Sequence, residues 1–403
     1  MEYPRGGGFV RSYGVNRDYI IPFYRRFNVS FTRGSGVCLY DSAGKRYLDF
    51  ASGVATSSLG HCHPAMVEAL RRQVGKLWHV SNLYNIAEAE RLAEELVRVS
   101  FADMAFFVNS GAEAVECGFK IARSYQNGIG HSERYKMLTL RRSFHGRTYA
   151  ACSASEPTMF TPLLYPYVDW FVSVSPSIDA IREEIEKGII GAVLVEPVQA
   201  EGGVHILGKE LLEDLRALCD QHDVLLFFDC VQCGFGRTGK FFAYEHFGVT
   251  PDICAIAKGM GGGFPVGGCL VTHKAGKFVT ARMHGSTYGG NPLAAVAALT
   301  VLSEIQKPGF LDSVTHNGNH LLSGLRNLSK KHKIIREVRG LGLLIGLEVD
   351  GNVYEITAKL IDMGVLVAPI GAGSVIRVVP PLVVTRDEID EALNVFDRLF
   401  STL

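Results

Sequence analysis

The sequence predicts an α/β protein with a mostly parallel sheet of seven strands and a second, smaller α+β domain. Two observations in the middle of the chain support the sheet. Seven short apolar runs recur there, and amphipathic helical patterns such as residues 112–125 and 209–221 lie between several of them. Runs that are apolar along their whole length fit strands covered by helices on both faces, as in parallel sheets. The seven runs are residues 104–108, 136–140, 170–174, 192–195, 225–228, 253–257 and 268–271.

A third observation concerns the ends of these runs, because polar or charged residues come within a few positions after five of them. In open α/β sheets ligands bind at the carboxyl ends of the strands. We therefore expect a binding site along that edge of the sheet. The residues concerned are Asn109 and Ser110 after the first run, Ser143 to His145 after the second, and Glu196, Asp229 and Lys258 after the fourth, fifth and sixth.

Two of these charges give the strongest chemical signal in the chain. The sixth run delivers Lys258 into a glycine-rich turn, and the fifth run ends in Asp229. A lysine is rarely buried unless it has a task there. A lysine that can form a Schiff base and an aspartate that can face a pyridinium nitrogen are the two protein groups that pyridoxal 5'-phosphate (PLP) needs most. Either charge alone fits a strand end that reaches solvent, but the pair favours a PLP site.

Composition excludes several other classes. Basic and acidic residues both number 41, so nothing indicates a nucleic acid or an anionic membrane surface as partner. No apolar run approaches the ~20 residues of a membrane span, and residues 1–8 lack the apolar centre of a signal peptide. Nine cysteines scattered through apolar segments fit a reducing compartment. We expect a cytoplasmic protein that is long enough for two domains.

Other candidate site residues each have a plainer interpretation. The segment 109–112 (Asn-Ser-Gly-Ala) leads into a predicted helix whose first N–H groups could hold a phosphate, although a serine N-cap is the commoner use. Phe144 could stack on a ring and Arg147 could bind a carboxylate, or they could be a core aromatic and a surface charge. Arg377 lies inside the apolar run 375–379, where it must be paired or face a cavity.

Two further motifs point elsewhere, and we interpret both as coincidental. The glycines at 234, 236 and 239 match a dinucleotide-binding fingerprint, but no acidic residue ends a second strand about 20 residues later. Cys230 and Cys233 have the spacing of half a zinc site, and His61 and His63 flank a cysteine. Neither set has the second ligand pair that a zinc site needs, so we expect no metal.

Four segments together resemble the class III aminotransferases, which are PLP-dependent transferases of fold type I. They are Gly-His-Cys-His-Pro (60–64), Phe-His-Gly-Arg-Thr (144–148), Gly-Arg-Thr-Gly-Lys-Phe-Phe-Ala-Tyr-Glu (236–245) and the run that ends at Lys258. The resemblance extends from about residue 17 to the C-terminus. Within the family, the chain is most similar to the members that act on N-acetylornithine, some of which also use N-succinyl-diaminopimelate.

The resemblance implies a role for each matching residue. Lys258 bonds to the cofactor aldehyde and then moves a proton, while Asp229 keeps the ring nitrogen protonated. The other implied cofactor contacts are Gln232 at the ring hydroxyl, Phe144 and Val231 on the ring faces, Ser110, Gly111 and Ala112 at the phosphate, and Thr287 at the phosphate of the partner subunit. The implied substrate contacts are Arg147, Glu201, Ser286 and Arg377, and we expect Glu201 to pair with Arg377 while the ω-amine is bound. A residue shared between subunits implies an obligate homodimer.

The resemblance also joins the two ends of the chain into one small domain. Residues 17–50 read as short strands with a hairpin turn at 41–44, and strand-like runs recur at 343–349 and 375–379. We expect residues 1–60 and 305–403 to form the small domain, and residues 61–304 to form the large PLP-binding domain.

Three positions depart from the usual pattern of the family. Cys230 stands where glutamate is common, Ala112 replaces a frequent threonine, and Ala200 replaces a frequent glycine before Glu201. The loss of the threonine hydroxyl removes one donor to the phosphate, worth about 1 kcal/mol. None of the three removes a group that transamination requires.

The expected reaction moves the ω-amino group of N2-acetylornithine to 2-oxoglutarate, giving N-acetylglutamate 5-semialdehyde and glutamate. This would serve arginine biosynthesis, or lysine biosynthesis where N-succinyl-diaminopimelate is the amine. Ornithine and 4-aminobutyrate aminotransferases are the alternatives within the fold, and glutamate-1-semialdehyde aminomutase is a weaker one. An NAD-dependent dehydrogenase is the alternative from another class, and a binding protein without catalysis would have little reason to combine Lys258, Asp229, Arg147 and Arg377.

Overall fold

The computed structural model of the chain describes residues 19–160, 162–370 and 374–403. Residues 1–8, where we expected no signal peptide, lie outside this part. The chain divides into two compact units, Met1–Ser30 and Phe31–Leu403. The described residues 19–30 contain no strand, whereas short strands were expected from residue 17. Pro22 leaves one backbone position in this stretch without an N–H group.

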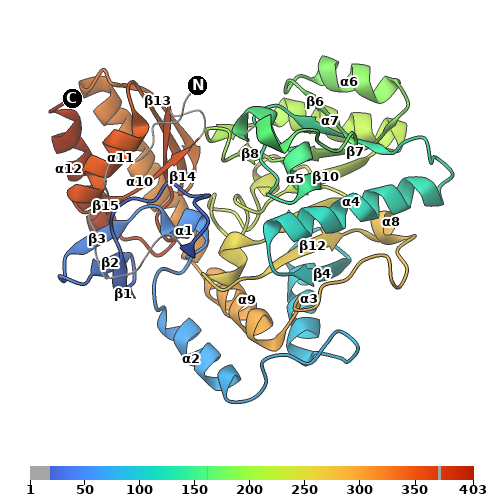
Figure 1. Cartoon of the computed structure of the whole chain (residues 1–403), viewed down its shortest axis with the longest axis horizontal. Coiled ribbons are helices and arrows are strands. Elements are labelled where there is room, and N and C mark those ends of the chain that lie inside the picture. Colours follow the sequence, from blue (N-terminus) through green and yellow to red (C-terminus); the bar gives the residue numbers. More distant parts are fainter. Residues whose placement is uncertain (1–18, 161, 371–373) are drawn as a thin grey trace. The chain divides into compact units, whose positions relative to one another are not determined.

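The second unit is built around a seven-stranded sheet with the order β4-β12-β11-β10-β7-β5-β6 (Figure 1). Only β12 runs antiparallel to its neighbours, so the predicted fold class is confirmed. Each predicted run forms one strand, with ends that shift by at most two residues. The strands are β4 Met104–Val108, β5 Lys136–Leu140, β6 Phe171–Val174, β7 Ile190–Val195, β10 Leu225–Asp229, β11 Ile253–Ile256 and β12 Gly267–Val271.

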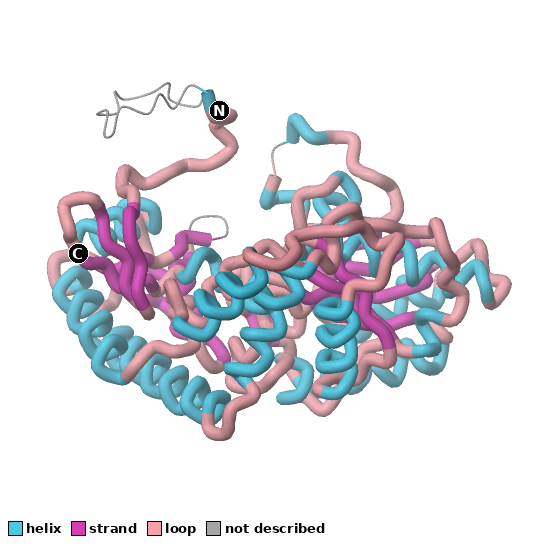
Figure 2. Tube along the Cα trace, turned by 90° about the horizontal axis from the view of Figure 1, so that it is seen from below, coloured by secondary structure: helices cyan, strands magenta, loops and turns pink. Residues whose placement is uncertain are grey.

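Both faces of this sheet are buried, as its continuous apolar runs require. Along β10, Leu225 and Phe227 belong to one core cluster, and Leu226 and Phe228 belong to the other. Helix α4 (Gly111–Gly128) packs against β11 and β12, and α7 (Lys209–His222) packs against β10. Helices lie around these strands in Figure 2. The ends of the central strands β7, β10 and β11 are therefore held between two packed layers.

The helices follow the sequence signals at their ends. Ser110 caps α4, and Asn291 caps the alanine-rich α9 with Pro292 in its first turn. The remaining helices of the second unit are α1 Ser52–Ala55, α2 Pro64–Val74, α3 Ala87–Arg98, α5 Tyr149–Ala154, α6 Ile178–Glu186, α8 His273–Gly276, α9 Pro292–Ile305, α10 Phe310–Lys331, α11 Val353–Asp362 and α12 Arg386–Phe400.

Two smaller sheets contain the strands from the two ends of this unit. One has the order β1-β2-β3-β15 and the other β13-β14-β17-β16, and a two-stranded sheet joins β8 to β9. In the first, β15 pairs parallel with β3, so segments more than 300 residues apart lie side by side. The strands are β1 Phe31–Ser35, β2 Cys38–Asp41, β3 Arg46–Asp49, β8 Val198–Gln199, β9 His205–Ile206, β13 Ile335–Leu341, β14 Leu344–Val349, β15 Val365–Leu366, β16 Ala368–Ile370 and β17 Val375–Val378.

Strand β13 was not predicted from the sequence. Its apolar residues Ile335, Val338 and Leu341 recur every three positions, whereas a half-buried strand shows an alternation of two. The pairing of β13 with β14 shifts register between Ile335 and Glu337, which is a bulge. The extra residue explains the spacing of Ile335 and Val338, which are both buried although they lie three positions apart.

None of the helices in the described part of the chain is both long and apolar enough to cross a lipid bilayer.

The close contact of α4 with the sheet gives a stability prediction. A Cβ added at Gly118 would lie 2.2 Å from Cζ of Phe227, whose side chain is fully buried. We expect Gly118→Ala to lower the free energy of unfolding by about 1–3 kcal/mol, because the core must shift to admit it. Urea unfolding measures this change. Gly75→Ala is the matched control, since the nearest atom to its new Cβ lies 3.9 Å away; equal changes in both variants would contradict the prediction.

Candidate active site

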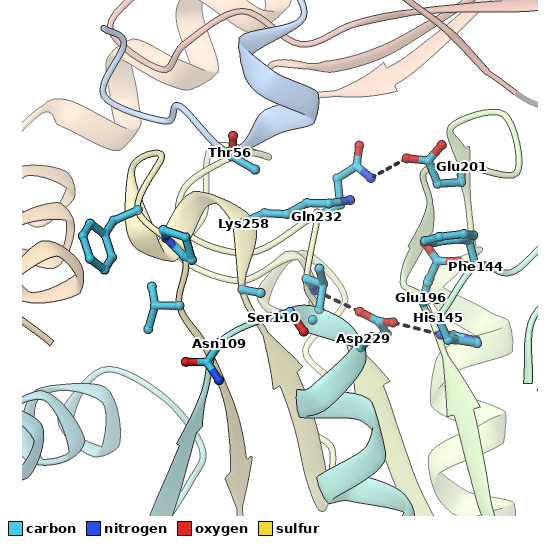
Figure 3. Close-up of a pocket in the computed structure, with 18 of the residues that line it drawn as sticks. Thr56, Asn109, Ser110, Phe144, His145, Glu196, Glu201, Asp229, Gln232 and Lys258 are labelled. Carbon is cyan, nitrogen blue, oxygen red and sulfur yellow. Dashed lines mark hydrogen bonds and ion pairs between the residues drawn. The ribbon is translucent and has the colours of Figure 1, made fainter. Parts of the chain in front are cut away.

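The carboxyl ends of the central strands surround a cavity of about 330 Å³ (Figure 3). Five segments that follow strands of the seven-stranded sheet contribute to its wall, as the sequence predicted. Thr56, directly after α1, closes the cavity from another part of the chain. The wall consists of Thr56, Asn109, Ser110, Gly111, Ala112, Phe144, His145, Gly146, Glu196, Glu201, Asp229, Val231, Gln232, Ala257, Lys258, Gly263, Phe264, Pro265 and Val266.

Lys258 enters the cavity from the end of β11. It begins a 3-10 helix, Lys258–Gly261, and its φ of +47° lies in the left-handed region that a lysine seldom adopts. Strain of this kind is usually retained where a side chain must point in one direction. Desolvation lowers the pKa of the Lys258 amine, although the nearby Glu201 carboxylate opposes this shift. A larger share of the amine is therefore neutral and nucleophilic at neutral pH.

Asp229, the last residue of β10, has both carboxylate oxygens held by the protein. Oδ2 lies 2.9 Å from Nδ1 of His145, and Oδ1 accepts a hydrogen bond of 3.0 Å from the Val231 N–H (Figure 3). The side chain is only 5% exposed. Asp229 therefore presents a carboxylate of fixed orientation at the cavity floor.

Glu196 is a second buried carboxyl group in the same wall. Its Oε1 accepts the Phe144 N–H at 2.8 Å, and its Oε2 accepts the Ala200 N–H at 3.2 Å. Burial raises the pKa of Glu196 well above its ordinary value, and the charge of Asp229 raises it further. Glu196 thus holds together the segments that follow β5 and β7.

Glu201 and Arg377 form an ion pair of 2.5 Å at the upper side of the cavity. Arg377 lies in β17 and is only 2% exposed, and Glu201 also accepts a hydrogen bond of 3.4 Å from Gln232. Burial alone would raise the pKa of Glu201, but the Arg377 guanidinium and the Lys258 amine lower it to about 2. The lone arginine of the apolar run is therefore paired, with a carboxylate 176 residues away.

The N-terminus of α4 supplies a third kind of group, free backbone donors. Ser110 is the N-cap and accepts a hydrogen bond from the Glu113 N–H at 3.3 Å. Gly111 and Ala112 are the first helical residues, and both line the cavity. First-turn N–H groups lack partners within their helix and favour an anion. The structure thus contains both the serine cap and the geometry of an anion site.

Four of the predicted substrate or phosphate contacts lie outside this wall, and one of them, Arg377, meets it only through its pairing with Glu201. Arg147 is exposed, with its guanidinium carbon 5.4 Å from the ring centre of Phe144 and 4.7 Å from that of Phe160. Ser286 and Thr287 line a neighbouring hollow that shares only Asn109 with the cavity. Nδ2 of Asn109 donates to Oγ of Ser286 at 3.2 Å. Within this single chain, Thr287 is not among the described residues that line the cavity.

The motifs set aside in the sequence have structural roles. The glycine fingerprint at 234–239 forms turns that lead into a 3-10 helix, Ala243–His246, and not into the α-helix of a dinucleotide site. His63 precedes the first residue of α2, so its segment is a helix entry. Cys230 is fully buried in the main core cluster, together with Cys233 and Cys254. In the described part of the chain no three histidine, cysteine or acidic residues are placed to bind a metal.

The donors in the cavity fit PLP. The wall combines an amine, a fixed carboxylate and the open end of a helix, which match an aldehyde, a ring nitrogen and a phosphate. Oε1 of Gln232 is buried with no hydrogen-bond partner among the described residues. An acceptor left in this state is explained by a donor on a bound molecule, such as a ring hydroxyl.

Comparisons with known proteins agree with this geometry. Residues 22–400 match the family model described as aminotransferase class-III, so the chain belongs to that family, whose members use PLP. It is 46% identical over 372 residues to an acetylornithine aminotransferase of Agrobacterium fabrum, covering 92% of this chain and 93% of that one.

Among solved structures, the chain is similar to an ornithine aminotransferase from Toxoplasma gondii, reported with partial occupancy of PLP at its active site. The TM-score is 0.90 and the identity 31%, over 96% of this chain and 93% of that one. The N-acetylornithine aminotransferase of Stenotrophomonas maltophilia gives a TM-score of 0.83 and 34% identity, over 94% and 97% of the two chains.

Reasoning from the sequence missed two features of the cavity. The bond between His145 and Asp229 was not expected, although both follow predicted strands of the same sheet. No sequence pattern indicated that Thr56 lines the cavity. It follows four residues with positive φ, Ser52 to Ala55, of which only one is glycine. A left-handed turn made mostly of other residues cannot be recognised from residue types alone.

Proposed function

We propose that this protein transfers the ω-amino group of N2-acetylornithine to 2-oxoglutarate, giving N-acetylglutamate 5-semialdehyde and glutamate, as a step of arginine biosynthesis. The observation that carries the proposal is the high identity to acetylornithine aminotransferases, which is 46% over 372 residues for that of Agrobacterium fabrum. Among solved structures, the N-acetylornithine aminotransferase of Stenotrophomonas maltophilia (34%) and the ornithine aminotransferase of Toxoplasma gondii (31%) are similarly identical to the chain. N-Succinyl-diaminopimelate is a second candidate amine, which would add a role in lysine biosynthesis.

When bound, PLP supplies an aldehyde that takes up the amine and a ring that accepts electrons from the adjacent carbon. Lys258 would be the amine that bonds to this aldehyde and would afterwards carry a proton at the reacting carbon. Asp229 would hold a proton on the ring nitrogen, and Gln232 would bind the ring hydroxyl. Phe144 and Val231 would hold the ring, and Ser110, Gly111 and Ala112 would bind the phosphate through the start of α4.

The two substrates differ in whether a carboxylate lies beside the reacting amine, so the group that binds this carboxylate must be neutralised in another way when it is missing. Glutamate carries a carboxylate beside its reacting amine, whereas N-acetylornithine carries none beside its ω-amine. We assign Arg377 to the α-carboxylate of glutamate and Arg147 to its distal carboxylate. The observed pair of Glu201 with Arg377 supports an arrangement in which Glu201 neutralises the arginine while the ω-amine reacts.

The assembly that we propose is a homodimer with shared active sites. Thr287 would bind the phosphate in the partner subunit and Ser286 would lie near the substrate there, which agrees with their place outside the cavity of their own chain. We place the large domain at 61–304 and the small domain at 1–60 and 305–403, supported by the pairing of β3 with β15. Burial of eight of the nine cysteines as thiols supports a cytoplasmic location.

The visible spectrum of the purified protein tests the substrate assignment. N-Acetylornithine, ornithine, N-succinyl-diaminopimelate and 4-aminobutyrate are added separately to the PLP-loaded protein, and loss of the cofactor band is timed. We expect N-acetylornithine to react at least about tenfold faster than ornithine or 4-aminobutyrate, since a site that binds the acyl amide leaves polar groups unpaired when that amide is missing.

Each alternative gives a different result in this experiment. An equally fast reaction with N-succinyl-diaminopimelate would indicate an enzyme of both pathways. A faster reaction with ornithine would overturn the substrate and favour the activity of the Toxoplasma gondii neighbour. Failure to take up PLP at all would overturn the catalytic assignment.

A further inference from the structure

His145 is buried beside the proposed ring site, but its ring is directed at Asp229 (Figure 3). Nδ1 lies 2.9 Å from Oδ2 of Asp229, and the His145 side chain is 0% exposed. An ionised carboxylate can only accept a hydrogen bond, so Nδ1 is the donor. Nε2 has no partner among the described residues. In the described part of the chain, the ring therefore makes one polar contact, and that contact is Asp229.

The backbone fixes the position of His145. Its N–H donates to Oγ of Ser155 at 2.8 Å, and Oγ of Ser155 donates in turn to the Ala151 carbonyl at 2.7 Å. Gly146, the next residue, has a φ of +137° and passes so close to Ala112 that an added Cβ would lie 2.7 Å away. The backbone is therefore held in place at His145 and at Gly146, so the imidazole has little freedom to turn away from Asp229.

Asp229 needs an external constraint at this position. One oxygen is held by the Val231 N–H and the other by the His145 ring, so the two contacts together restrict rotation of the carboxylate about its Cβ–Cγ bond. The ionisable groups that interact with Asp229 are Glu196 and Lys258. Burial and the charge of Asp229 raise the pKa of Glu196, so a carboxylate that turned toward Glu196 would meet a second acidic group.

We infer that His145 is a positioning residue, which fixes Asp229 in the orientation that meets the pyridine nitrogen of PLP. The inference rests on the proposed placement of Asp229 at that nitrogen and adds a residue to which neither the cavity contacts nor the family comparison assigned a role. His145 acts on PLP only through Asp229. Its loss should therefore change cofactor binding and turnover while leaving the binding of the amine substrate unaffected.

Two amide variants distinguish this role from simple packing. In His145→Asn the amide nitrogen can occupy the place of Nδ1, whereas in His145→Gln it falls near the place of Nε2. We expect His145→Asn to keep the PLP dissociation constant and kcat within about threefold of the unchanged protein. We expect His145→Gln and His145→Phe to weaken PLP binding and lower kcat by about 10- to 100-fold, the value of a hydrogen bond to a charged group, with KM for the amine unchanged.

PLP affinity is measured by equilibrium dialysis, the ring environment by the visible band of bound cofactor, and kcat and KM by steady-state assay. His332 offers the matched control, since it is 8% exposed and its Nε2 lies 2.6 Å from Oδ1 of Asp397, outside the cavity wall. We expect His332→Asn and His332→Gln to leave cofactor affinity and kcat unchanged. Urea unfolding of each apoprotein verifies that the variants are folded.

The outcomes separate this inference from the proposed function. Equal losses in His145→Asn and His145→Gln would show a packing role and overturn the inference alone, and this comparison decides the matter even where His145→Phe does not fold. Unchanged affinity and spectrum in all three variants would also overturn it. If Asp229→Asn itself leaves PLP affinity and spectrum unchanged, the placement of Asp229 fails, and the inference fails with it.

Discussion

Replacement of Lys258 by alanine is expected to lower kcat for transamination by about 10³- to 10⁴-fold, which is the largest effect of any substitution considered for this chain. Lys258 is the only amine among the described residues that line the cavity. Without it no side chain can bond to the PLP aldehyde or carry the proton at the reacting carbon. The first half-reaction with N-acetylornithine, followed by rapid-mixing absorbance, measures the loss directly.

The cofactor should still bind to this variant, because the phosphate and ring contacts remain in place. A small primary amine in the buffer, such as methylamine, should restore part of the rate by entering the space left by the side chain. Lys187→Ala is the matched control, since Lys187 is a surface lysine paired with Glu184, and it should keep full activity. A Lys258→Ala protein that turned over at more than about a tenth of the normal rate would refute the assignment of Lys258.

The site could be predicted from the sequence wherever a residue follows a buried strand. Lys258 and Asp229 both end apolar runs, and a parallel sheet brings such ends to one edge whatever the details of packing. The same logic predicted the start of α4 at the cavity. These assignments needed only the order of the strands along the chain, because each residue is fixed by its own strand.

Contacts that join different layers could not be predicted in this way. The pairing of Arg377 with Glu201 was expected only with the help of the family resemblance, because it depends on how β17 is placed against the turn after β8. Its position in an apolar run predicted that Arg377 is paired or faces a cavity. In the structure it is paired with Glu201, which lines the cavity. Arg147 could not be settled, because an exposed arginine over two aromatic rings fits either a substrate contact or a surface charge.

The Arg377–Glu201 pair leads to the second large effect, an unequal loss between the two half-reactions. Glu201→Ala should slow the N-acetylornithine half-reaction by about 100-fold and change the glutamate half-reaction by less than about fivefold. In the first, Arg377 would be a buried cation without a partner, which costs about 3–5 kcal/mol when one member of a buried pair is removed. In the second, the carboxylate of glutamate itself neutralises Arg377, so Glu201 is not needed. Rapid-mixing measurements of each half-reaction alone give the two rates.

The charge of Glu201 is what this argument requires, and its pKa supports it. Because that pKa is lowered to about 2, the carboxylate stays ionised and the pair stays intact across the whole neutral range. Glu201→Gln keeps the size of the side chain and removes the charge, so it should resemble Glu201→Ala in the N-acetylornithine half-reaction. Equal losses in both half-reactions would instead show that Glu201 supports the cavity as a whole, and the assignment of Arg377 to two alternating partners would have to be abandoned.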